Sequence, residues 1–150
     1  MGKIDISLAR MQRDSFANLV RYALLTERNT ATDTLNAKYL LENNILKRKN
    51  RLTAGFDYLD ASQDVDDGGY SGNPDKLTLS KKNYALYLLD QLYLLDKLSA
   101  TGGWRYDIVH YNFEQEAAVR GSEQSKFKET VFSAALNYNY AADSNIYANF

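Results

Sequence analysis

The acidic run Asp64-Val65-Asp66-Asp67-Gly68-Gly69 contains the residue types that most resemble a metal site. Clustered carboxylates beside glycines suit Ca²⁺, which prefers several oxygen ligands. The run lacks the later glutamate that completes an EF-hand loop, so a solvated acidic loop is the better interpretation. We therefore expect no metal site and no cofactor.

The rest of the chain offers little that could do catalysis. It has no cysteine and a single histidine, His110, which we expect on a strand, facing solvent or a polar interior. It has no glycine motif that would cradle a phosphate, no serine in a nucleophile context and no basic stripe with interleaved aromatics. We expect neither an enzyme nor a nucleic-acid-binding protein, and we name no catalytic, cofactor-binding or ligand-binding residue.

Arg105 and Asp107 are charged residues within a strictly alternating segment. Because successive side chains of a strand point to opposite faces, this segment predicts one apolar face and one polar face, and the alternation should run from about Leu98 to about Phe113. We expect Arg105 and Asp107 to form ion pairs on the polar face. The apolar face contains Leu98, Ala100, Gly102, Trp104 and Tyr106, and the polar face contains Ser99, Thr101, Gly103, Arg105 and Asp107.

The same period of two recurs in residues 51–58, 131–140 and 144–150. We predict an all-β protein, an antiparallel meander of about seven long strands forming part of a transmembrane β-barrel. Trp104, Tyr106, Tyr138 and Tyr140 fit aromatic girdles at the membrane boundary. The predicted strands are 3–13, 28–42, 49–62, 76–94, 97–115, 126–141 and 144–150.

The predicted connections alternate in length. Those near 43–48, 95–96 and 142–143 are short, whereas those near 14–27, 63–75 and 116–125 are long and polar. Outer-membrane barrels have short periplasmic turns and longer extracellular loops. Two segments remain ambiguous, because residues 14–28 and 84–95 also carry apolar residues at helical spacing.

The composition is compatible with a barrel. Eighteen basic and 19 acidic residues leave a formal net charge of −1, and 12 tyrosines accompany one proline. The mean hydropathy of −0.49 is no obstacle, because half of each barrel strand faces a polar lumen. The first residues, MGKIDISLAR, lack the apolar core of a secretion signal.

Several motifs in order resemble the barrel of a TonB-dependent outer-membrane receptor. They are Leu89-Asp90, Asp96-Lys97-Leu98, Gly103-Trp104-Arg105-Tyr106-Asp107, Leu136-Asn137-Tyr138 and Ile146-Tyr147-Ala148. Their order and spacing match over roughly residues 49–150.

The resemblance implies a cell-outer-membrane location and a role in importing siderophores or similar metal chelates. Family members are similar in having a plug domain inside a barrel of about 22 strands. We therefore expect residues 1–150 to be a partial β-barrel domain without plug or signal peptide. Outer-membrane lipid and an iron–siderophore or similar chelate are the implied partners, and TonB and the plug belong only to the full-length parent. The loops 63–75 and 116–125 are the implied ligand contributors.

Two alternatives remain open. A chain of 150 residues suits a small, complete eight-stranded outer-membrane barrel, if residues 14–28 supply another strand. A soluble β-rich or α+β binding module, with helices at 14–28 and 84–95, would explain the polar average.

Overall fold

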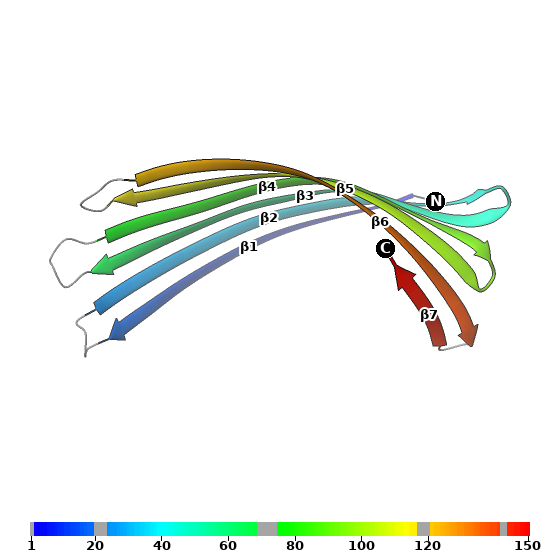
Figure 1. The fold of residues 1–150 in the computed structure, drawn as a ribbon, viewed down its shortest axis with the longest axis horizontal. Coiled ribbons are helices and arrows are strands. Elements are labelled where there is room, and N and C mark those ends of the chain that lie inside the picture. The colour runs from blue at the N-terminus through cyan, green and yellow to red at the C-terminus, as the bar shows by residue number, and fades with distance from the viewer. Residues whose placement is uncertain (1, 20–23, 69–74, 117–120, 142–143) are drawn as a thin grey trace.

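The seven strands of this protein form one antiparallel sheet in sequence order (Figure 1). The computed structural model describes residues 2–19, 24–68, 75–116, 121–141 and 144–150. The strands are β1 (Gly2–Leu19), β2 (Leu24–Ile45), β3 (Arg48–Gly68), β4 (Asp75–Leu95), β5 (Leu98–Glu116), β6 (Gly121–Ala141) and β7 (Ser144–Asn149).

Alternating apolar and polar residues, with many tyrosines and few breaks, favour extended backbone along each strand. The β2–β3 pairing runs without a shift from Leu25↔Gly68 to Ile45↔Arg48. The pairing of β4 with β5 shifts once, between Tyr93 and Leu95. The predicted all-β meander of seven strands is therefore confirmed.

The strands are longer than the sequence predicted, and the long polar connections are correspondingly shorter. Residues 14–19 belong to β1, 24–27 to β2, 63–68 to β3 and 121–125 to β6. The prediction of loops there was wrong because these segments are polar on at least one face, a pattern that resembles loop composition. Residues 20–23, 69–74, 117–120 and 142–143 lie outside the described residues.

Neither predicted helix is present in the described part of the chain. Residues 84–95 lie in β4, which confirms the strand interpretation. Residues 14–19 and 24–28 lengthen β1 and β2 instead of forming a helix or an additional strand. In the described ranges no helix is long and apolar enough to cross a membrane.

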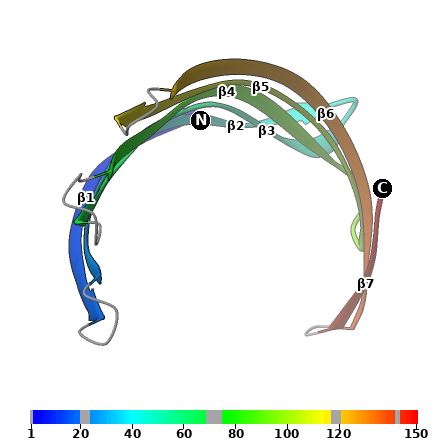
Figure 2. The same cartoon turned by 60° about the vertical axis from the view of Figure 1, so that its left-hand side comes forward.

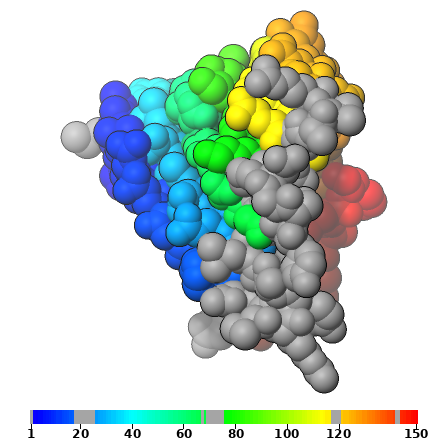
Figure 3. Space-filling model, turned by 90° about the vertical axis from the view of Figure 1, so that its left-hand side faces the viewer, coloured from blue at the N-terminus to red at the C-terminus, as the bar shows by residue number. Residues whose placement is uncertain are grey.

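The sheet curls into an arch, with β1 and β7 at its two sides (Figure 2). Each of these edge strands pairs with one neighbour among the described strands, so the sheet is open. A closed eight-stranded barrel does not fit this arrangement. Figure 3 shows the strands side by side in sequence order across the molecule.

The sheet has almost no buried core of its own. Ala85 is the one buried hydrophobic residue among the described residues, and it is 1% exposed. Large apolar side chains such as Phe132 and Ile4 are instead 75% and 68% exposed. A surface of this kind is stable only when another medium or another part of a protein covers it.

The turn between β2 and β3 contains two residues in the left-handed region. Leu46 has a φ of 51° and Lys47 a φ of 64°. Two-residue hairpins favour this backbone twist but prefer Asn or Gly in it. This turn is therefore strained at two non-glycine positions.

Candidate functional site

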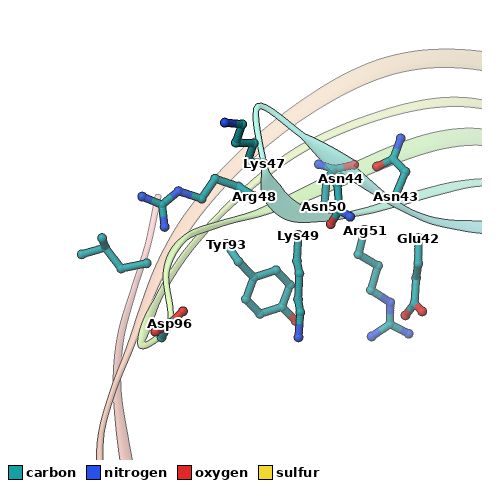
Figure 4. A pocket seen from close by; sticks show the side chains of 11 residues that line it. Glu42, Asn43, Asn44, Lys47, Arg48, Lys49, Asn50, Arg51, Tyr93 and Asp96 are labelled. Atoms are coloured by element: carbon teal, nitrogen blue, oxygen red, sulfur yellow. The ribbon is translucent and has the colours of Figure 1, made fainter.

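The pairing register assigns each described strand residue to one of two faces. Partners in an antiparallel pair share a face, and neighbours along a strand alternate. In Figure 4 the side chains of Glu42, Lys49 and Tyr93 point to the concave side of the arch, and Asn43 points to the convex side. Following the register from these residues places the remaining side chains.

The convex face is apolar over the half of the sheet that ends in the two-residue turns, which we call the turn half. We call its apolar surface the outer band. Polar exceptions include Asp90 and Asn50, which hydrogen bond to each other. The band comprises Ile4, Ile6, Leu8, Leu35, Ala37, Tyr39, Leu41, Leu52, Ala54, Phe56, Tyr58, Tyr84, Leu86, Leu88, Leu92, Ala100, Trp104, Tyr106, Ile108, Phe132, Ala134, Leu136, Tyr138, Ile146 and Ala148.

The concave face of the turn half is mainly polar, with Leu89, Val131 and Tyr147 as exposed apolar exceptions, and it contains a charged network. The Arg105 guanidinium donates to Asp57 at 2.8 Å and, through Nε, to Asp107 at 2.8 Å. Asn83 donates to Asp107 at 3.2 Å. The predicted ion pairing of Arg105 and Asp107 on the polar face is confirmed, with Asp57 as a partner that the sequence did not indicate.

Small residues make room for this network. Ala85 of β4 lies in register between Asp57 of β3 and Asp107 of β5. The side chain of Arg105 can therefore pass over the small methyl group of Ala85 to reach Asp57. Beside it, the ring of Tyr87 covers Gly55, where a Cβ atom would collide with the ring. Arg105 lies 5.9 Å from the centroid of the same ring. The inner wall is thus held together across three strands.

The polarity of the convex face reverses where the outer band ends. The next row of convex residues is charged on five of six neighbouring strands, with His110 on the remaining one, and two ion pairs run along it, Arg10–Asp33 at 3.3 Å and Lys82–Asp60 at 3.3 Å. We call the part of the sheet beyond this point the far half. The row consists of Arg10, Asp33, Asp60, Lys82, His110 and Lys126.

The concave face reverses in the opposite sense. In the far half of β4, β5 and β6 it carries a group that we call the inner aromatic patch. The Tyr111 and Phe127 rings meet edge to face at 5.9 Å, and the Lys81 ammonium lies 5.4 Å from the Tyr111 centroid. The patch consists of Leu79, Lys81, Val109, Tyr111, Phe113 and Phe127.

The inner aromatic patch has the chemistry of a binding surface. Tyr111 and Phe127 are 43% and 57% exposed, so their rings are free to make contacts. Exposed rings on a concave wall offer stacking area, and the nearby ammonium favours an anionic group on the bound molecule. This patch is the candidate functional site.

The sequence analysis missed this patch for a specific reason. It assigned one alternating phase from Leu98 to Phe113, with Trp104 and Tyr106 on the apolar face. In the structure the apolar phase switches after Ile108, and Val109, Tyr111 and Phe113 lie on the face of Arg105. Two apolar neighbours, Ile108-Val109, are the sequence signal that marks the switch.

The acidic residues considered as a calcium site lie on β3. Asp64 accepts a hydrogen bond from Thr78 at 2.8 Å, and Asp66 pairs with Lys76 at 3.6 Å. In the part of the chain that the structure describes, no group of three metal-ligating side chains gathers. His110 is exposed on the convex face, as expected for a strand residue facing solvent.

Of the aromatic residues assigned to girdles, Trp104, Tyr106 and Tyr138 lie on the convex face, and Tyr140 falls at the irregularity of the β6–β7 pairing. Trp104 and Tyr106 are stacked with centroids 6.5 Å apart, and Tyr138 and Tyr140 lie near the turn end of β6. The girdle role of these four residues stays a prediction. The sequence analysis did not single out Tyr58 and Tyr84. Their ring centroids are 5.1 Å apart where the outer band meets the charged row.

A concavity of about 880 Å³ lies at the turn end, between the β2–β3 and β4–β5 hairpins (Figure 4). Its lining mixes cations, among them Lys49 and Arg51, with the carboxylates of Glu42 and Asp96. It is the mouth of the concave face and not an enclosed pocket.

Residues 7–150 match the family model described as TonB dependent receptor-like, beta-barrel. A comparison with curated protein sequences finds no match.

Solved structures share the fold of this chain over 99% of its length. The ferric citrate transporter FecA in the unliganded form has a TM-score of 0.80 at 18% identity, with 24% of that chain covered. The alcaligin outer membrane receptor FauA from Bordetella pertussis has a TM-score of 0.79 at 15% identity, with 25% of that chain covered. The siderophore receptor PiuA from Acinetobacter baumannii has a TM-score of 0.75 at 15% identity, with 29% covered. This chain thus spans about a quarter of the length of these proteins.

Proposed function

The chain belongs to the TonB-dependent receptor β-barrel family, and on that premise we propose that it forms part of the wall of an outer-membrane barrel that imports a siderophore or similar ferric chelate. The observation that carries this proposal is the paired reversal of polarity. Across β4, β5 and β6, the turn half is mainly apolar outside and mainly polar inside, whereas the far half is charged outside and aromatic inside. A wall that leaves a bilayer for water partway along its strands needs this pattern.

The outer band fits the hydrocarbon layer. On β5 it runs from Ala100 to Ile108, and the matching face of β4 runs from Leu92 to Tyr84. Strands of about 9–11 residues cross a bilayer when tilted. The band therefore accounts for the exposed apolar side chains without a second protein layer.

Residues 1–150 act in this proposal as a partial β-barrel domain. β1 and β7 each present one side without a described strand partner, and such edges are very unfavourable in lipid because backbone groups there lack hydrogen bonds. Further strands would cover both edges. The TonB complex and a plug domain are partners of that complete receptor.

The far half would stand on the extracellular side, where family members carry their longer loops. There the inner aromatic patch would line the vestibule and contact the incoming chelate. Solved structures with this fold include a ferric citrate transporter, an alcaligin receptor and a ferripyoverdine receptor. The Lys81 ammonium and the Tyr111 and Phe127 rings suit an anionic chelate with flat or apolar parts.

Ligand binding by the complete receptor tests this role. Replacing Tyr111 and Phe127 by alanine should weaken chelate binding at least about tenfold, because each lost stacking contact is worth roughly 1 kcal/mol. The matched control is Glu114→Gln, which lies on the convex face of β5, the strand of Tyr111. Binding measured by tryptophan fluorescence quenching should fall for the double variant and not for the control. Equal binding by all three proteins would remove the patch from the ligand path.

A further inference from the structure

A hollow of about 630 Å³ lies on the far half of β4, β5 and β6, just beyond the outer band. Its lining includes Lys82, His110 and Lys126, which stand side by side in one row of the register. Ser80, Asn112 and Gln124 supply further polar groups in the next row along the same face. The hollow therefore combines positive charge with hydrogen-bond donors.

The positive charge of this region is only partly neutralised on its own face, where Asp60 and Glu114 are the nearby carboxylates. Lys82 pairs with Asp60, but Lys126 and Lys128 have no ion pair among the described residues. Both residues are exposed on the convex face, Lys126 in the charged row and Lys128 opposite Ile108 in the last row of the outer band. An anion bound here would meet up to three lysines from two strands.

The neighbourhood of the hollow selects the kind of anion. Directly below the charged row, Tyr84 and Ile108 belong to the outer band, followed by Leu86 and Tyr106. A ligand with a phosphate head and acyl tails would place the head in the hollow and the tails along these side chains. A small free anion would use only the upper part of this surface.

We propose that this hollow is a binding site for the phosphorylated head group of an anionic lipid in the outer leaflet. The proposal rests on the proposed function, because it needs the outer band to face acyl chains. Lys82, Lys126 and Lys128 would hold the phosphate, while Gln124 would donate to an oxygen of the head group. Asn112, whose amide nitrogen also donates to Glu114 at 3.0 Å, would supply its second N–H. Tyr84, with its phenol at the end of the band, would mark the depth at which head group and tails meet.

The test uses the complete receptor, freed of lipid in detergent and titrated with lipid A carrying both phosphates. Each lysine near an anionic lipid is worth roughly fivefold in affinity. The variant Lys82→Gln/Lys126→Gln/Lys128→Gln should therefore bind on the order of 100-fold more weakly. Dephosphorylated lipid A should bind wild-type receptor with a similar loss.

The matched control is Lys76→Gln, on the same strand and face as Lys82 but three convex positions further from the outer band. It should bind lipid A like the wild type. Unchanged binding by the triple variant would overturn the proposal. Displacement of the lipid by an equal concentration of inorganic phosphate would overturn the assignment to a lipid.

Folding is checked by the heat-dependent gel mobility of the barrel. If the triple variant does not fold, the double variant Lys126→Gln/Lys128→Gln replaces it, because neither lysine forms an ion pair among the described residues. This double variant should bind lipid A about 25-fold more weakly than the wild type. Failure of the lipid site is distinguishable from failure of the proposed function. If the lipid site is wrong, the receptor still inserts into vesicles, but the lysine variants bind lipid A as tightly as the wild type does. If the proposed function is wrong, the receptor does not insert.

Discussion

The turn half and the far half of this sheet have the same backbone but opposite surfaces. In the turn half Trp104 and Phe132 face outward and Arg105 and Asp107 face inward, whereas in the far half Lys82 and Lys126 face outward and Tyr111 faces inward. Backbone pairing continues without interruption across the boundary. The difference shows that one continuous backbone pairing carries side chains of opposite polarity along the same strands.

The largest expected effect comes from charging the two faces of the turn half in turn. Ala134 lies on the outer band and Ala135 on the concave face of the same strand. Ala134→Arg should lower the free energy of unfolding of the complete barrel in vesicles by about 2–4 kcal/mol, because an arginine then meets lipid. Ala135→Arg should lower it by much less. Equal losses in urea titrations would contradict the assignment of the faces.

Filling the space beneath the inner ion pair comes next. Ala85→Leu should lower the free energy of unfolding by about 1–3 kcal/mol, because the larger side chain displaces Arg105 from Asp57. The control is Ala9→Leu, an exposed concave position on β1. A loss at Ala9 as large as that at Ala85 would show that the crossing over Ala85 is not the cause.

The ion pairs of the two halves should differ in strength. Arg105 and Asp57 are 2.8 Å apart with side chains 38% and 27% exposed, while Lys76 and Asp66 are 3.6 Å apart and 59% and 45% exposed. Double-mutant cycles with Gln and Asn should give a coupling of about 1 kcal/mol for the first pair and below about 0.5 kcal/mol for the second. A stronger coupling for the far-half pair would contradict this order.

The smallest effect concerns the hairpin that closes the turn half. Leu46→Asn/Lys47→Gly should raise the free energy of unfolding by about 0.5–1 kcal/mol, because both positions have a positive φ. The same change at Asp96 and Lys97, where neither residue has a positive φ, should give no gain. A gain at both turns would mean that backbone strain at Leu46 and Lys47 is not its source.

The sequence predicted the fold well because alternation reports directly on a strand with two different media on its faces. Strand number, the short turns and the inward pairing of Arg105 with Asp107 all followed from it. The strands of the far half were not predicted to their full length, because segments such as residues 63–68 and 121–125 have the composition of loops. Only the register shows that Asp64 of β3 pairs with Thr78 of β4 in the sheet.

The candidate site escaped for a related reason. Tyr111 and Phe113 alternate as regularly as Trp104 and Tyr106 do, but in the other phase. A single phase assigned to the whole strand puts all four on one surface. The partner strand resolves this, because Phe127 stands opposite Val109 and its ring meets Tyr111.

Each strand of this sheet pairs with the strand that precedes or follows it in the chain. Among the described residues, every strand pairs with a strand adjacent in sequence. Contacts between segments close in sequence form fastest. The sheet is therefore suited to form one hairpin at a time. Each added strand hydrogen bonds to the unpaired edge of the strand before it. The slow event in such an assembly is the final seam, where the first and last strands of the finished cylinder must meet.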